Sequence, residues 1–158
     1  MNFKLLSSGI LLFMTSFSVW GKDPELHKLI PIHSKGTAAY YVDGYIDGFG
    51  PAQLLVDTGA GYTTINEEML AVLKKRGQAK FVKKLSGILA DGSHKVVPVY
   101  LIPGINIGGE CMIRDVEAVI FPAKTRLILG MNTLLKVSPF TFSMDPPSLL
   151  LSNCGNSV

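Results

Sequence analysis

One aspartate stands where a hydrophobic strand gives way to turn-forming residues, in the stretch LLVDTGAGYTT at residues 54–64. Asp57 follows three apolar residues and precedes Thr, Gly, Ala and Gly. Burying a carboxylate is costly unless a partner or hydrogen bonds offset the cost. Three interpretations of Asp57 therefore compete: a turn residue that bonds its own backbone, a metal ligand, or one of a catalytic pair of carboxylates.

The surrounding sequence favours the catalytic interpretation. Alone, Asp-Thr-Gly is a common turn, and no His or carboxylate is spaced near Asp57 to complete a metal site. An apolar strand, however, would carry Asp57 into a desolvated place, while Gly59 and Ala60 would let the turn fold tightly. A second apolar run ending in glycine, LILG, follows at residues 127–130. The two segments together favour acid–base catalysis by two carboxylates that share a proton and hold a water.

In these two segments the chain resembles the retropepsin-like aspartic proteases, the family of the retroviral proteases and their exported bacterial relatives. The matching residues are LLVDTGA at 54–60, Thr-Thr-Ile at 63–65 and LILGMNTL at 127–134. GILADGSHK at 87–95 lies where the family has its flap hairpin, and the resemblance spans residues 38–152. It implies a mainly β, single-domain, closed half-pepsin barrel with one or two short helices. It also implies aspartic endopeptidase activity, and we expect no metal and no cofactor.

The resemblance implies a role for each matching residue. Asp57 would be the catalytic aspartate, and Gly59 would orient its carboxylate through a backbone amide. Thr58 would bond across to the partner loop, and Ala60 would line the adjacent wall. The segment that crosses behind this loop would be formed by Ile128, Leu129 and Gly130. The tip of the flap, which closes over substrate, would lie at Ala90, Asp91 and Gly92.

Two features depart from the family pattern. Retroviral members usually carry an acidic residue directly after Asp-Thr-Gly-Ala, where this chain has Gly61. A polar contact to the substrate backbone would therefore be missing. The flap tip has a single glycine, Gly92, with His94 close by. We expect His94 to be a solvent-exposed turn residue; a pH-sensitive flap is the alternative.

A single Asp-Thr-Gly segment requires a second copy of the chain. This chemistry needs one ionised and one protonated carboxylate, and like charges about 3 Å apart cannot both ionise. The chain holds no second such segment, because Asp91 and Asp145 both lie in turn sequences. We therefore expect a homodimer whose two Asp57 side chains meet on the two-fold axis, acting on extended polypeptides. The alternatives are a non-catalytic dimeric peptide-binding module on the same fold and a monomeric structural domain.

The N-terminal residues predict export. Lys4 precedes an apolar stretch at residues 5–19, and small residues lead to Gly21, the pattern of a secretory signal peptide over residues 1–21. The apolar stretch is short for a bilayer, which needs about 20 residues, and an uncleaved inner-membrane anchor is the alternative. We expect a flexible lead at residues 22–37 and the protease domain at residues 38–158. The protein would then be periplasmic or secreted.

Composition indicates one domain and no nucleic-acid partner. The chain has 158 residues and a net charge of +3 at pH 7, which suits a single modest core. The basic residues of segment 74–84 carry no nucleic-acid motif, and a solvated helix end and loop is the favoured interpretation. Cys111 and Cys154 are the two cysteines. In an oxidising compartment, a disulfide between them and two free thiols are both compatible with the sequence.

Local patterns predict strands around one clear helix. Apolar runs at residues 38–42, 45–46 and 52–56 are separated by turn pairs at 43–44, 47–48 and 50–51. A helix is expected over residues 66–76, with Asn66 as N-cap, acidic residues in the first turn, basic residues in the last and Gly77 as the stop. Further turns are expected at 91–92, 103–104, 108–109 and 145–147, and one or two helical turns after residue 130.

Overall fold

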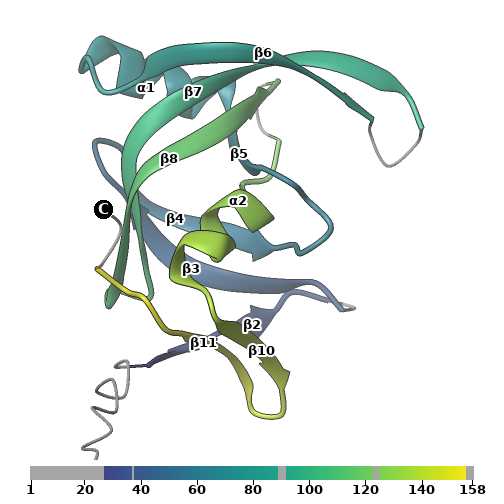
Figure 1. Ribbon diagram of the computed structural model, residues 1–158, viewed down its shortest axis with the longest axis vertical. Helices are drawn as coiled ribbons and strands as arrows, with labels where there is room; N and C mark the ends of the chain where they lie inside the picture. The colour runs from purple at the N-terminus through teal and green to yellow at the C-terminus, as the bar shows by residue number, and fades with distance from the viewer. Residues whose placement is uncertain (1–26, 37, 89–91, 123–124, 156–158) are drawn as a thin grey trace, which may run out of the picture.

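Strands dominate the structure and form two sheets (Figure 1). The computed structural model describes residues 27–36, 38–88, 92–122 and 125–155. The strands are β1 Lys28–Pro31, β2 His33–Ser34, β3 Tyr40–Ile46, β4 Gly50–Val56, β5 Thr63–Asn66, β6 Lys80–Ile88, β7 His94–Ile107, β8 Cys111–Phe121, β9 Ile128–Leu129, β10 Phe140–Met144 and β11 Pro147–Leu151. The helices are α1 Glu67–Lys75, α2 Met131–Leu134 and the single 3-10 turn η1 Leu135–Val137.

The larger sheet closes into a barrel. Its strand order is β2-β3-β4-β9-β5-β8-β7-β6, and a further pairing joins β3 to β7. The pairs β4–β9 and β5–β8 are parallel, whereas the other pairs are antiparallel. Alternate residues of the strands point inward, so the barrel encloses fully buried side chains such as Val42, Leu54 and Ile105. The expected mainly β, single-domain closed barrel with two short helices is confirmed.

Helix α1 follows its sequence signals closely. The Asn66 side chain accepts a hydrogen bond from the Met69 amide at 2.9 Å, which caps the first turn. Acidic residues occupy the first turn and basic residues the last, in agreement with the helix dipole. The buried face, formed by Met69, Leu70 and Leu73, packs on the barrel. The helix expected over residues 66–76 is therefore confirmed.

Several predicted turns are correct, and three are wrong. Turns connect the strands at residues 47–49, 108–110 and 145–146, as expected. Asp43-Gly44, however, lies inside β3, and Pro103-Gly104 lies inside β7. Gly50-Pro51 forms the first two residues of β4, which pair with β3. Gly44 pairs with both β4 and β7, and a Cβ there would lie 3.0 Å from the Asn106 carbonyl oxygen. This glycine therefore permits a close strand approach and does not mark a turn.

Residues expected to form a flexible lead are part of the fold. Strand β1 pairs antiparallel with β11, with Ile30 opposite Leu149, and β2 pairs with β3. Ile30 and Ile32 are buried in the core. The folded domain thus includes residues 28–34 and begins before residue 38. The predicted signal peptide at residues 1–21 lies outside the described residues, and so does segment 22–26.

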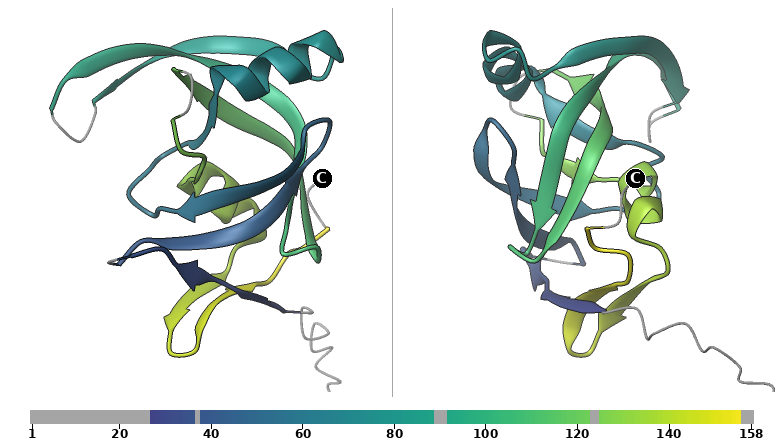
Figure 2. Two further views of the ribbon diagram at one scale, coloured as in Figure 1. Left: turned by 180° about the vertical axis from the view of Figure 1, so that it is seen from behind. Right: turned by 60° about the vertical axis from the view of Figure 1, so that its left-hand side comes forward.

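The β6–β7 hairpin projects from the barrel on the same side as the loop between β4 and β5 (Figures 1 and 2). The three-stranded sheet, in the order β1-β11-β10, lies at the opposite end of the molecule. Across the described residues, no helix is both long and apolar enough to cross a membrane. The projecting hairpin and the loop frame the site described below.

Cys111 and Cys154 form a disulfide. Cys111 is the first residue of β8 and is fully buried, whereas Cys154 follows β11. The bond therefore ties the C-terminal segment to the barrel. Of the two arrangements that the sequence allowed, the disulfide is the one observed.

We predict that this disulfide contributes strongly to stability. It closes a loop with a sequence separation of 43 residues, and the loss of chain entropy in the unfolded state corresponds to about 4 kcal/mol. Urea unfolding with and without a thiol reductant measures the contribution. The double variant Cys111→Ala, Cys154→Ala is the control, because its stability should not respond to the reductant. Equal midpoints for the oxidised and reduced wild-type protein would contradict the prediction.

Candidate active site

Asp57 lies at the carboxyl end of β4, where the strand enters a tight turn. Its backbone amide donates to the Leu129 carbonyl at 3.2 Å, so the pairing with β9 continues to this residue. One carboxylate oxygen, Oδ1, accepts a hydrogen bond from the Gly59 amide at 2.8 Å. The Ala60 amide donates to the Asp57 carbonyl at 3.2 Å and closes the turn. Asp57 is half-buried, and its carboxylate is oriented by the backbone of its own loop.

The segment at residues 130–132 lies behind this loop and holds it through backbone hydrogen bonds. The Met131 amide donates to the Ala60 carbonyl at 2.8 Å, and the Asn132 amide donates to the Gly61 carbonyl at 3.1 Å. Gly130, between β9 and α2, packs directly on the backbone of the loop. A Cβ at Gly130 would lie 2.7 Å from the Thr63 amide nitrogen and nearer still to the Tyr62 carbonyl. No residue with a side chain fits at this crossing without displacing the loop.

Buried hydroxyl groups reinforce the crossing. Thr63 and Thr133 are fully buried, and their Oγ1 atoms lie 2.6 Å apart. Thr63 Oγ1 also accepts from the Gly130 amide at 3.2 Å. Each buried hydroxyl therefore has a hydrogen-bond partner, as burial requires. These bonds fix β5 to the start of α2.

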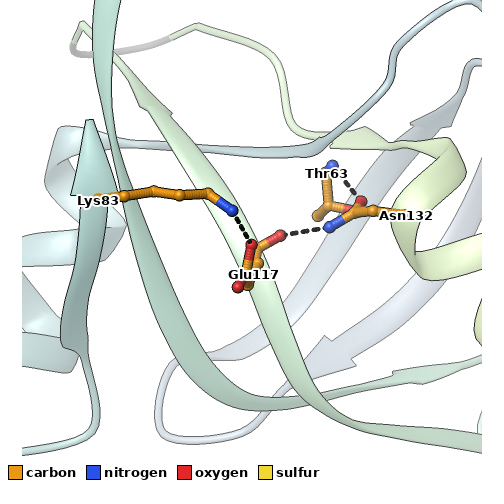
Figure 3. Close-up of polar contacts among 4 residues, drawn as sticks. All are labelled: Thr63, Lys83, Glu117 and Asn132. Carbon is orange, nitrogen blue, oxygen red and sulfur yellow. Dashed lines mark hydrogen bonds and ion pairs between the residues drawn. The ribbon is translucent and has the colours of Figure 1, made fainter. Parts of the chain in front are cut away.

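Asn132 is the residue that sequence reasoning missed. Its side-chain oxygen accepts from the Thr63 amide, and its side-chain nitrogen donates to the Glu117 carbonyl, both at 2.7 Å (Figure 3). One amide group thus joins α2 to β5 and β8. The available signal was a polar amide within the apolar segment 127–135, because a polar group placed there needs partners.

A second polar contact reaches the base of the β6–β7 hairpin. The Lys83 ammonium on β6 lies 3.1 Å from the Glu117 carboxylate on β8 (Figure 3). It also lies 5.6 Å from the centre of the Tyr62 ring. Hydrogen bonds to Glu117 and then Tyr62 raise the pKa of Lys83 above its ordinary value. Because Lys83 is exposed, the pair contributes little to the stability of the fold, although it joins β6 to β8.

A groove of about 490 Å³ lies between the hairpin and the Asp57 loop. Its lining is mainly apolar, and among the described residues Asp57 and Lys95 are the charged side chains that line it. The lining residues are Asp57, Gly59, Ala60, Gly61, Tyr62, Thr64, Leu85, Gly87, Ile88, Lys95, Val97, Val119, Phe121 and Ile128. The groove has the form of a site for apolar side chains beside a carboxylate.

The structure places the predicted site residues in different surroundings. Asp57, Gly59, Ala60 and Ile128 line the groove. Leu129 and Gly130 are buried behind the loop, and Thr58 is exposed in the turn. In the predicted flap tip, Gly92 is exposed, and the neighbouring His94 begins β7 as an exposed residue. Ala90 and Asp91 lie outside the described residues.

Sequence comparison identifies the family. Residues 42–136 match the family model described as "gag-polyprotein putative aspartyl protease". The chain belongs to this family of aspartyl proteases. The match contains β4, the Asp57 loop, the β6–β7 hairpin and the β9–α2 crossing. Comparison with curated proteins gives no match.

Solved structures show the same aspartyl protease fold. The chain is similar to the crystal structure of a retropepsin-like aspartic protease from Rickettsia conorii, with a TM-score of 0.54 and 18% sequence identity. The similarity covers 79% of this chain and 89% of the other. The retropepsin-like fold that the sequence motifs predicted is therefore confirmed.

We predict that Gly130→Ala destabilises the protein by about 3 kcal/mol or more, because the added methyl group overlaps backbone that cannot move without breaking the loop. Urea unfolding followed by circular dichroism measures the change. Gly87→Ala is the matched control, since a Cβ at Gly87 meets nothing within 4 Å, and it should shift stability by less than about 0.5 kcal/mol. Equal effects of the two substitutions would refute the steric argument.

Proposed function

We propose that the protein is an exported aspartic endopeptidase that works as a homodimer. The observation that carries the proposal is Asp57 itself. Its carboxylate is held by the Gly59 amide at the floor of an apolar groove, in a chain of the aspartyl protease family. One chain supplies one Asp-Thr-Gly loop, whereas hydrolysis by a pair of carboxylates needs two. A second copy related by two-fold symmetry supplies the other.

The proposed mechanism uses the two Asp57 side chains as one acid–base unit. The ionised carboxylate takes a proton from a water, and the oxygen of that water attacks the scissile carbonyl carbon. The protonated carboxyl donates its proton to the carbonyl oxygen, which gives a neutral tetrahedral intermediate. The newly protonated carboxyl then gives its proton to the leaving nitrogen as the carbon–nitrogen bond breaks. The other carboxylate takes a proton from one hydroxyl of the intermediate, which becomes the new carboxyl group. The pair ends with one shared proton, as it began.

The loop geometry supports this mechanism at two points. The hydrogen bond from Gly59 fixes one carboxylate oxygen, so the other is left to act on water and substrate. Thr58 lies exposed in the same turn, and in the dimer we expect it to bond to the partner's loop. Backbone pairing and the close packing of Gly130 hold the loop in place. The carboxylate therefore has the fixed orientation that catalysis needs.

The groove supports an extended polypeptide as substrate. It is lined by residues of the β6–β7 hairpin and of the Asp57 loop, and its apolar lining suits side chains that alternate along an extended chain. Tyr62, Leu85 and Val97 supply part of this apolar surface. A non-catalytic peptide-binding module would use the same groove, and the experiment below separates the two functions.

Two observations support export. The N-terminal sequence has the pattern of a signal peptide, and the folded domain carries a disulfide. Disulfides persist in oxidising compartments such as the periplasm or the cell exterior. A periplasmic or secreted protease is the proposal, with an inner-membrane anchored form as the alternative if residues 1–21 stay attached.

We predict that Asp57→Asn abolishes proteolysis, with a loss of at least about a thousandfold, because the amide can neither accept nor share the catalytic proton. Residues 22–158 are incubated with an unfolded protein from acidic to neutral pH, and fragments are read by mass spectrometry. Asp145→Asn is the matched control, because Asp145 is an exposed turn residue and its loss should leave cleavage unchanged. Cleavage by Asp57→Asn at the wild-type rate would overturn the proposal.

A mixing experiment tests the homodimer in the same assay. Wild-type protein mixed with excess Asp57→Asn forms mixed dimers that hold one carboxylate. Activity per wild-type chain should therefore fall in proportion to the wild-type fraction. Activity that stays constant per wild-type chain would contradict a shared site. Groove binding of peptides by both proteins, with cleavage by neither, would identify a binding module.

We predict that the protein recovered from producing cells begins near residue 22. Intact-mass analysis of the native protein identifies its first residue, and reaction with a thiol reagent shows whether the disulfide has formed. A variant with two charged residues placed in segment 5–19 is the control, since it should block export and leave Cys111 and Cys154 reduced. A full-length chain in the membrane fraction would favour the anchored form. A full-length chain with free thiols in the cytoplasm would overturn export.

A further inference from the structure

The charge of the groove is carried by few residues. Among the described residues that line it, Asp57 and Lys95 are the charged ones, and the others are apolar, glycine, threonine or tyrosine. Gly61 lines the groove in the position directly after Asp-Thr-Gly-Ala, where it adds no charge. Asp57 is assigned to the chemistry. Lys95 has no part in that chemistry, and its place in the groove calls for another explanation.

Lys95 lies on the wall of the hairpin that faces the groove. It is two residues from Val97 on β7, and alternate residues of a strand point to the same face. Val97 and Lys95 both line the groove. Across the hairpin, Lys95 pairs with Gly87 of β6. Gly87 has no side chain, and a Cβ there would meet nothing within 4 Å, so space lies open beside the lysine.

Lys83 and Lys95 lie on the same hairpin but differ in their charged partners. Lys83 lies opposite Val99 on the same hairpin and has the Glu117 carboxylate at 3.1 Å. Lys95 is exposed, and its ammonium lies 5.7 Å from the centre of the Phe121 ring. Within the described residues, no carboxylate forms an ion pair with Lys95. The ring positions the ammonium by a cation–π contact and leaves its N–H donors open to the groove.

We propose that Lys95, held over Phe121, forms a subsite for an acidic side chain of the substrate. The proposal rests on the proposed function, because it takes the groove to bind an extended polypeptide. A Glu or Asp of the substrate would receive charge-assisted hydrogen bonds from the Lys95 ammonium. The neighbouring residues of the substrate would place apolar side chains against Val97 and Val119. Lysine or arginine at the same substrate position would be repelled.

The experiment measures binding and does not depend on turnover. The probe is a set of fluorescently labelled peptides with two central apolar residues, in which one Glu is moved through the flanking positions. Each peptide has a Gln and a Lys counterpart. Affinities for the full domain carrying Asp57→Asn are read by fluorescence anisotropy. At one or more flanking positions we expect Glu to bind on the order of fivefold more tightly than Gln, and Lys more weakly than Gln.

Matched variants assign the preference to Lys95. Lys95→Gln in the same background should bring the Glu and Gln peptides to equal affinity while leaving the Gln peptide unchanged. Lys84→Gln removes an exposed lysine of the same hairpin that does not line the groove, and it should keep the preference. The preference should also shrink as salt rises from low to high concentration. Equal binding of Glu and Gln peptides by the Lys95 protein would overturn the proposal, and so would a preference that survives Lys95→Gln.

The outcomes separate this proposal from the protease assignment. If wild-type protein cleaves nothing but prefers Glu peptides through Lys95, the subsite stands and the catalytic proposal fails. If wild-type protein cleaves with no change in cleavage-site preference between Lys95 and Lys95→Gln, the protease stands and the subsite fails. Mass spectrometry of the fragments from an unfolded protein gives the second readout.

Discussion

The close crossing of Gly130 over the backbone at Tyr62 and Thr63 is the constraint on which the site depends. Strand β9 has only two residues, yet it pairs with β4 on one side and β5 on the other. Both ends of the Asp57 loop are thereby attached to one short segment. The loop needs no bulky side chain to hold its shape, because backbone hydrogen bonds from the start of α2 support it from below.

A chain of polar contacts extends this support from the loop to the hairpin (Figure 3). Glu117 is its centre. Its carbonyl accepts from the Asn132 side chain, and its carboxylate pairs with Lys83. Strand β8 therefore connects the floor of the groove with the base of the hairpin that covers it. The inner contacts, made by both ends of the Asn132 amide, are partly buried and give the groove a defined shape. The outer ion pair, which is exposed, can yield at little cost.

The sequence predicted the features whose signals are local, and missed those whose partners are distant. The cap at Asn66 and the charges around it determine α1 within ten residues. Asp57 and the run that ends at Gly130 could be found because each motif is compact. In contrast, Gly44 has the sequence of a turn but faces two strands at once. Ile30 is buried by a partner strand about 120 residues downstream. The bonds of Asn132 to Thr63 are equally invisible in a local pattern.

Two-fold symmetry gives the charge of the groove a further consequence. In the proposed dimer, the two Asp57 side chains share one proton and carry a single negative charge, while each chain contributes its own Lys95. The two lysines would lie on opposite sides of the scissile bond, because the axis passes between the carboxylates. A bound peptide runs through the groove in one direction. Its residues before and after the scissile bond would each meet one of the two equivalent ammonium groups. An acidic residue on either side would then favour binding, and a peptide with acidic residues on both sides would contact both lysines. Gly61 fits this arrangement, because it lines the same groove and adds no carboxylate to it.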